Sequence, residues 1–202
     1  SHPCIRTEDV SSALLRSKKD PVFEFTNALT DRNLDEALFF LDSLISGGVL
    51  AHPLQLLGAV VNQLRKLILI KGFVESPDGR CWQPSMNFNA FKARVLPALQ
   101  AYDERLVEEL SRWQDTKNSV PGHPEAPLKD KGSSKKPKTD LLTVSSPKNP
   151  YPVFMMMRKS ERFSLAELVD DLKEAARADE RIKTGGGDPR MILERAVISV
   201  CQ

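Results

Sequence analysis

The stretch SLAELVDDLKEAARADERIKTGGGDPRMILERAVISV, residues 164–200, contains two helix beginnings and one helix end. Ser164 and Glu167 have the spacing of a capping box. The helix that they begin is predicted to have its apolar side at Leu168, Val169, Leu172, Ala176 and Ile182. Glycines 185–187 predict its end, because glycine favours left-handed C-terminal positions. Asp188 and Pro189 then open a last helix with an apolar side at Met191, Ile192, Ala196, Val197 and Val200.

Helical patterns also occupy the first third of the chain. Pro21 can begin a helix over residues 22–30 with Phe23 and Phe25 as apolar anchors. Asn33 and Glu36 predict a capped second helix, whose apolar stripe is Leu34, Ala37, Leu38, Leu41, Leu44 and Ile45. A helix of about 20 residues from Pro53 has apolar residues beyond one narrow stripe, which predicts a central position.

The middle of the chain predicts a loop, a long helix and a linker. Residues 76–85 are rich in turn formers, and the apolar spacing over residues 88–113 predicts an amphipathic helix that is kinked at Pro97. Residues 116–149 have five prolines, no aromatic residue and a charge of +4, from seven lysines and three acids. That composition predicts a flexible basic linker. Residues 150–160 predict a further helix, and because no convincing strand is present, the sequence predicts an all-α helical bundle.

No catalytic, metal-binding or cofactor-binding constellation is visible. His2, His52 and His123 stand in terminal, loop or linker sequence, and catalysis by histidine needs converging partners. Cys81 is interpreted as a partly buried structural thiol, and Met155–Met157 as flexible packing residues. A phosphate-binding role for glycines 185–187 is disfavoured because no Gly-Lys-Ser/Thr follows and Asp188 would repel the anion.

Compartment and membrane association follow from simple features. The longest apolar run, residues 53–74, contains Arg65, Lys66 and Lys71, which argues against a membrane-spanning helix. The cysteines, at positions 4, 81 and 201, show no pairing or metal spacing. A reducing, cytoplasmic location is therefore predicted. The first residues lack an initiator Met and a secretory signal, which suggests an excised fragment.

Several segments together resemble the delta subunit of bacterial DNA polymerase III. The first group is VFEFTNAL at 22–29, LDEAL at 34–38 and the helix over 56–70 with QLR at 63–65. The more specific group is residues 150–153, 158–163, SLAEL at 164–168, AD at 178–179, IKTGGGDPR at 182–190 and LER at 193–195. The resemblance covers about residues 5–75 and 149–201. Residues 76–149 depart from the shorter family pattern and are interpreted as an insertion.

The resemblance implies a domain organisation and a role. Residues 1–19, with a short helix at 7–15, would be the end of a lid-like domain, and residues 20–202 a helical C-terminal collar domain. In this family the collar packs with the motor and delta-prime subunits of the clamp loader, which places the sliding clamp on primed DNA. The N-terminal domain, which contacts the clamp, would precede this chain. The resemblance thus implies a non-catalytic part of the DNA polymerase III holoenzyme that acts in DNA replication.

Charged residues beside apolar stripes are candidates for the partner interface: Gln63, Arg65, Lys66, Arg190, Glu194 and Arg195. An ordinary solvated helix face explains them equally well. A second interpretation of the chain is a helical nucleic-acid-binding module that uses the lysines of residues 116–149. Its DNA affinity would fall steeply with salt, whereas apolar assembly would be far less sensitive to salt.

Overall fold

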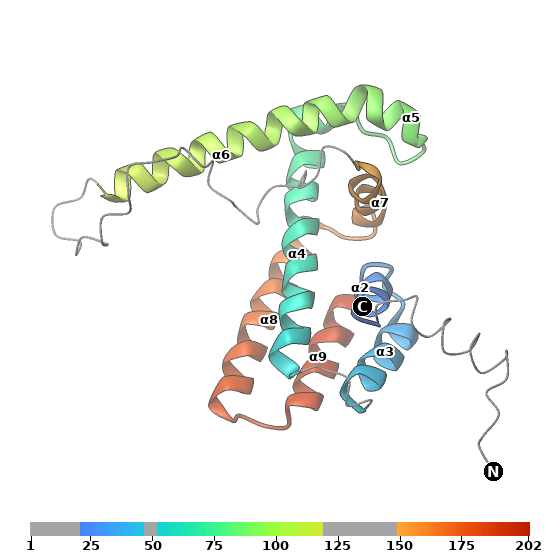
Figure 1. Cartoon of the computed structure of the whole chain (residues 1–202), viewed down its shortest axis with the longest axis vertical. Coiled ribbons are helices and arrows are strands. Elements are labelled where there is room, and N and C mark those ends of the chain that lie inside the picture. The colour runs from blue at the N-terminus through green and yellow to red at the C-terminus, as the bar shows by residue number, and fades with distance from the viewer. Residues whose placement is uncertain (1–20, 47–51, 119–148) are drawn as a thin grey trace, which may run out of the picture. The chain divides into compact units, whose positions relative to one another are not determined.

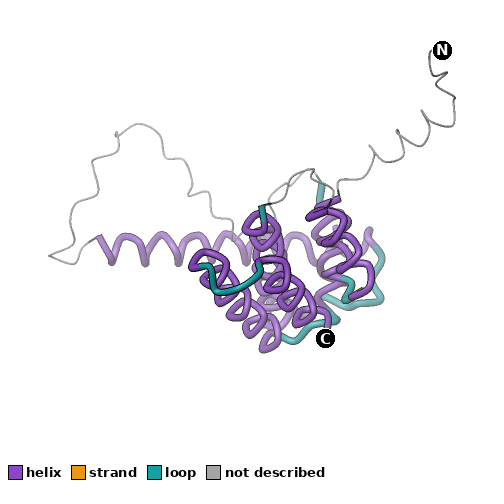
Figure 2. The backbone as a smooth tube through the Cα atoms, turned by 90° about the horizontal axis from the view of Figure 1, so that it is seen from below, coloured by secondary structure: helices purple, strands orange, loops and turns teal. Residues whose placement is uncertain are grey.

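The structure, a computed structural model, describes residues 21–46, 52–118 and 149–202. Within these ranges all regular structure is helical and no strand occurs, as Figure 2 shows. The predicted all-α class is therefore confirmed. None of these helices is long and apolar enough to cross a membrane. The expected helix at 7–15, the glycines at 47–48, Cys4, His2, His123 and most of the predicted linker lie outside the described residues.

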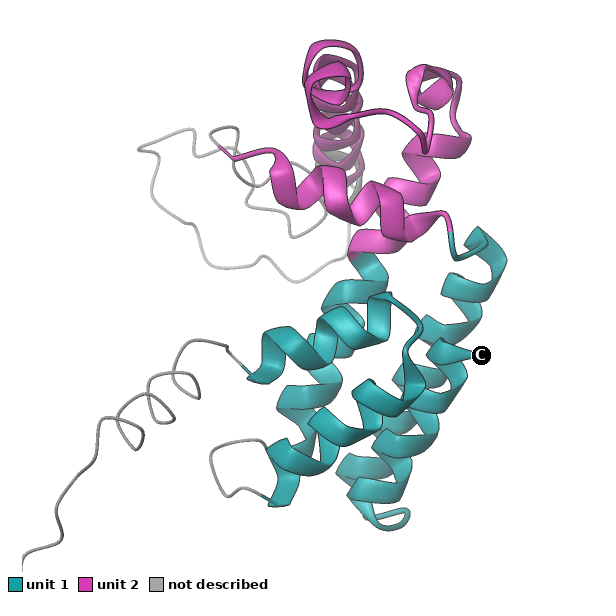
Figure 3. Cartoon of the chain, turned by 90° about the vertical axis from the view of Figure 1, so that its right-hand side faces the viewer, with its two compact units in different colours: residues 1–65, 162–202 teal, residues 66–161 magenta. Residues whose placement is uncertain are grey.

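The chain divides into two compact units, coloured in Figure 3. Unit 1 comprises residues 1–65 and 162–202, and unit 2 comprises residues 66–161. The boundary at residues 65 and 66 falls inside helix α4 (Pro53–Glu75), labelled in Figure 1. Unit 2 therefore includes the predicted insertion, together with the end of α4 and the helix that follows the linker.

Unit 1 is built from the first part of α4 and four further helices. These are α2 (Pro21–Thr30), α3 (Leu34–Ser46), α8 (Leu165–Thr184) and α9 (Pro189–Cys201). Contacts join α2 to α3, α8 to α9, and α9 to both α2 and α3. The side chains buried to 2% exposure or less include Phe25, Leu29, Ala37, Leu41, Leu57, Leu64, Leu168, Leu193 and Val197. The core of unit 1 therefore joins segments from both ends of the chain.

The helix ends of unit 1 form as the local sequence predicts. The Glu167 N–H donates to Ser164 Oγ at 3.1 Å, and the Ser164 N–H donates to Glu167 Oε2 at 2.8 Å. Gly185 ends α8 with φ at 72°, and its N–H donates to the Arg181 carbonyl. The Asp188 carboxylate accepts the Arg190 N–H at 3.0 Å, so the glycines join two helices. The Asn33 side chain likewise accepts the Glu36 N–H at 3.3 Å.

The inward faces of three helices differ from the prediction. Val169 and Met191 were expected on apolar sides, but they are 37% and 68% exposed, and Phe23 is 59% exposed. Helix α8 instead buries the line Leu168, Asp171, Ala175 and Ala178. This line has the three- and four-residue spacing of one helix face, and Val169 is rotated by about 100° from Leu168.

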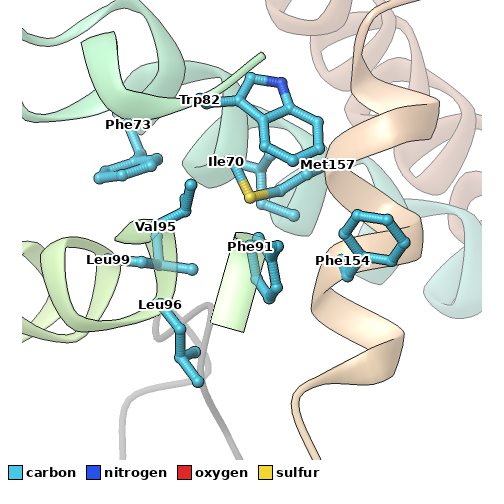
Figure 4. Close-up of a cluster of buried hydrophobic side chains, with 9 residues drawn as sticks. All are labelled: Ile70, Phe73, Trp82, Phe91, Val95, Leu96, Leu99, Phe154 and Met157. Carbon is cyan, nitrogen blue, oxygen red and sulfur yellow. The ribbon is translucent and has the colours of Figure 1, made fainter. Parts of the chain in front are cut away.

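Unit 2 has its own apolar core. Its elements after α4 are a 3₁₀ helix η1 (Pro77–Cys81), α5 (Phe88–Ala90), a π turn η2 (Phe91–Val95), α6 (Leu96–Asn118) and α7 (Tyr151–Ser160). The core cluster, drawn in Figure 4, is Ile70, Phe73, Trp82, Phe91, Val95, Leu96, Leu99, Phe154 and Met157. The Trp82 indole N–H also donates to Glu161 Oε1 at 2.8 Å. Residues of the predicted insertion thus pack against α4 and α7.

Two details of unit 2 refine the sequence prediction. The expected loop at 76–85 contains η1, in which the Gly79 N–H donates to the Ser76 carbonyl at 3.1 Å. The interruption expected at Pro97 is a π turn immediately before it, where the Leu96 N–H donates to the Phe91 carbonyl. Proline lacks an N–H and its ring crowds the carbonyl four residues back, and the wider turn relieves this crowding. Helix α6 then continues through Asn118, past the expected start of the linker.

Candidate assembly surface

A polar clamp holds the turn between α2 and α3 against the start of α8. Arg162 Nη1 donates to the carboxylate of Asp31 at 2.6 Å and to its carbonyl at 2.9 Å. Arg32 has a left-handed φ of 55°, and its guanidinium lies 4.4 Å from the centre of the Phe163 ring. The same guanidinium is 3.3 Å from Glu167 Oε2. The clamp therefore joins residues more than a hundred positions apart within unit 1.

A second polar contact joins α3 to α9. Arg190 Nη2 donates to Asp42 Oδ1 at 2.7 Å, and Arg190 Nε donates to Glu194 Oε1 at 2.9 Å. The hydrogen bond from Glu194 and the charge of Asp42 raise the pKa of Arg190 above its ordinary value. All three side chains are exposed or half-buried, so this contact contributes little to stability. It does fix which edges of α3 and α9 meet.

Large apolar side chains stand on both sides of this ion pair. Phe39, one turn before Asp42 on α3, is 68% exposed, and Met191, next to Arg190 on α9, is also 68% exposed. We call Phe39, Asp42, Arg190, Met191 and Glu194 the α3–α9 edge. Large apolar residues beside exposed polar groups are typical of surfaces that bind proteins. The α3–α9 edge is therefore the candidate assembly surface.

The structure brings together only part of the set predicted from sequence. Arg190 and Glu194 belong to the α3–α9 edge. Arg195 is exposed and lines a shallow groove of about 410 Å³ along α8 and α9, together with Asp170, Asp171, Lys173, Glu174, Arg177 and Ser199. Gln63, Arg65 and Lys66 lie on α4, where Lys66 is exposed and the other two are half-buried. The Oε1 atom of Gln63 is buried without a hydrogen-bond partner among the described residues.

Sequence reasoning missed three residues of the α3–α9 edge. Met191 was assigned to the buried side of the last helix, and Phe39 and Asp42 were not singled out. The Phe39–Phe40 pair could have given a signal, because two successive residues of a helix cannot both face the core. In the structure Phe40 is half-buried and Phe39 is exposed.

The side chains considered for chemistry have structural contacts. His52 Nδ1 accepts the Leu54 N–H at 3.3 Å at the start of α4. Cys81 is half-buried and donates to the Asp78 carbonyl at 3.3 Å, and Met157 is fully buried in the unit 2 core. Burial raises the pKa of the Cys201 thiol to about 11. Within residues 21–46, 52–118 and 149–202, no group of three or more His, Cys, Asp or Glu could hold a metal ion.

One buried carboxyl group, that of Asp171, makes stability depend on pH. Asp171 Oδ1 accepts the Ser199 hydroxyl at 3.1 Å, but burial raises the pKa of Asp171 despite this hydrogen bond. The folded chain therefore holds this proton more tightly than the unfolded chain does. The stability that the group contributes is fully present below its unfolded pKa and is lost as pH rises through its folded pKa.

The Asp171→Asn variant is expected to be more stable than the wild type at neutral pH. Asparagine keeps an acceptor for Ser199 and cannot ionise, so its advantage should vanish below about pH 3.9, the ordinary pKa of aspartate. Urea denaturation between acid and neutral pH measures the difference. Asp170→Asn is the matched control, because Asp170 is exposed and pairs with Lys173 at 2.7 Å. An equal stability gain in both variants would contradict the assignment.

The fold and the α3–α9 edge define a helical module suited to packing against other proteins. Residues 128–200 match the family model of the DNA polymerase III delta subunit, C-terminal domain, and this part of the chain belongs to that family. The resemblance seen in the sequence is thereby confirmed, and it supports the role of a clamp-loader component in DNA replication. No curated protein and no solved structure matched the chain significantly.

Proposed function

We propose that this chain is the non-catalytic assembly domain of a clamp-loader delta subunit. It packs with the equivalent helical domains of the motor and delta-prime subunits, and so supports loading of the sliding clamp on primed DNA in the cytoplasm. The clamp itself is contacted by another domain of the subunit, and any contact of this chain with DNA is indirect or weak. The family match over residues 128–200 supports this role.

The observation that carries the proposal is the exposure of Phe39 and Met191 beside the Arg190–Asp42 ion pair. An aromatic ring and a methionine left in water are stabilised by burial against a partner, since about 25 cal/mol is gained per Å² of apolar surface removed from water. The ion pair beside them can orient the partner. Residues 76–149 are proposed to be an insertion, which contributes much of the separate core of unit 2.

Reconstitution tests the proposed function. The chain, mixed with the motor and delta-prime subunits, is expected to elute as one complex in size-exclusion chromatography with light scattering, at both low and high salt. Apolar packing explains the salt tolerance, whereas counterion release would make DNA binding fall steeply with salt. Absence of a complex, together with salt-sensitive DNA binding by the chain alone, would favour the nucleic-acid-binding module that uses residues 116–149.

Substitutions at the α3–α9 edge test the surface separately. Phe39→Glu and Met191→Glu are each expected to weaken the complex by about tenfold or more, as hot-spot residues do. Phe23→Glu is the matched control, because Phe23 is 59% exposed on α2 and lies outside the edge. If Phe23→Glu alone breaks the complex, the assembly role stands and the surface is wrong. If the wild type forms no complex, the role itself is wrong.

A further inference from the structure

Helix α6 continues its apolar side beyond the part that unit 2 buries. Leu99 is fully buried, and the Tyr102 ring packs edge-on against Phe73 with 5.5 Å between centroids. The same side then carries Leu106 and Leu110, which are only half-buried, and Trp113, which is 69% exposed. Figure 1 shows α6 running past the other labelled elements of its unit. The distal half of α6 therefore presents an apolar stripe that the described residues do not cover.

Charged residues of both signs lie on one flank of this stripe. At about 100° per residue, Arg105, Glu109 and Arg112 fall on the same flank, and Val107 falls on the other. Arg105 pairs with Asp78 and lies 5.9 Å from the Tyr102 ring centre, so it is held within unit 2. Arg112 makes a loose, exposed pair with Glu108 at 3.9 Å. Glu109 and Arg112 are thus the opposite charges nearest the exposed stripe.

This pattern is complementary to itself in one orientation. When two identical helices pack antiparallel about a two-fold axis, the same flank of each copy meets the other. Glu109 of one copy then faces Arg112 of the other, and the pair occurs twice, while Leu106 faces Leu110. In a parallel pair, the charged flank would instead face the Val107 flank without a partner for its charges. The charges therefore favour an antiparallel pair.

We propose that the distal half of α6, residues 106–113, is a self-association surface that binds a second copy of this chain antiparallel. A two-fold pair closes on itself and leaves no stripe exposed for further growth. The surface is small compared with the roughly 800 Å² per partner of stable interfaces, so the association is weak, with a Kd on the order of 10 μM or more. This proposal concerns unit 2 and goes beyond the assembly role proposed for unit 1.

Sedimentation velocity of the 202-residue chain from about 1 to 200 μM tests the proposal, since this range spans the expected Kd. The wild type is expected to shift from monomer to dimer as concentration rises. Trp113→Glu should raise the Kd by about tenfold or more, because it puts a charge into the centre of the stripe. Circular dichroism checks that the helix is retained, and Phe39→Glu should leave the dimer unchanged.

Charge reversal tests the orientation. Glu109→Arg and Arg112→Glu should each raise the Kd by several-fold, because like charges then face each other across the pair. The double variant restores opposite charges between the copies and should return the Kd to near its wild-type value. A wild type that stays monomeric throughout, a dimer that survives Trp113→Glu, or a double variant as weak as the single variants would each overturn the proposal. Loss of the dimer in Phe39→Glu would also overturn it.

Discussion

Substitution of Gly79 by alanine is expected to lower the free energy of unfolding by about 3 kcal/mol or more. A Cβ at this buried position would lie 2.1 Å from the Phe73 carbonyl oxygen and 2.6 Å from Val74 Cα. Both are backbone atoms of α4, and the position of a Cβ is set by the backbone, so no change of rotamer relieves the clash. Either η1 or the end of α4 has to move, which breaks the packing around Trp82.

Urea denaturation followed by the fluorescence of Trp82 measures this loss in unit 2. A Trp113→Phe background removes the signal of the other tryptophan. Gly58→Ala is the matched control, because Gly58 is also in α4 but a Cβ there would meet no atom within 4 Å. Alanine favours helix over glycine, so this control should gain about 0.5–1 kcal/mol. Equal stability of the Gly79 variant and the wild type would show that η1 does not pack as described.

Truncation of Phe91 to alanine is expected to cost about 3–5 kcal/mol, the range found for buried phenylalanines. The Phe91 ring is fully buried, with ring centroids 6.2 Å from Trp82 and 5.3 Å from Phe154. It therefore contacts both the segment after η1 and helix α7, as Figure 4 shows. Its loss leaves a cavity that two aromatic rings from different elements cannot easily fill.

The same urea titration measures this effect, with Phe39→Ala as the control. Phe39 is 68% exposed, so its truncation should change stability by no more than about 0.5 kcal/mol. The two variants should also differ in the opposite sense in assembly, where Phe39 is the proposed contact. A loss below about 1 kcal/mol for Phe91→Ala would mean that the aromatic cluster does not form the core of unit 2.

Much of the fold could be predicted because helix signals are local. The capping box at Ser164, the glycine end at Gly185 and the proline start at Pro53 act through atoms within a few residues of each other. The regions predicted to be helical from residue 21 to 113 and from 150 onward are all found in the described ranges. The π turn before Pro97 follows from the same kind of local chemistry, but its form depends on how the chain relieves the crowding.

The candidate site was predicted only in part. Arg190 and Glu194 could be paired from their four-residue spacing, but Asp42 is 148 positions from Arg190 and has no sequence signal that links them. Whether Arg195, Gln63, Arg65 and Lys66 contribute to a partner interface stays a prediction. The exposure of Met191 could not be predicted either, because a single apolar residue at the edge of a stripe can face either way.

The sequence by itself determined where helices begin and end, that the class is all-α, and which family residues 128–200 belong to. Only the tertiary structure decided which apolar residues face outward, that Arg32 and Arg162 clamp α8, and that the inserted residues share a core with α4 and α7. The physical reason is range. Capping and helix periodicity depend on neighbours three or four residues away, whereas burial and ion pairing depend on segments brought together from distant parts of the chain.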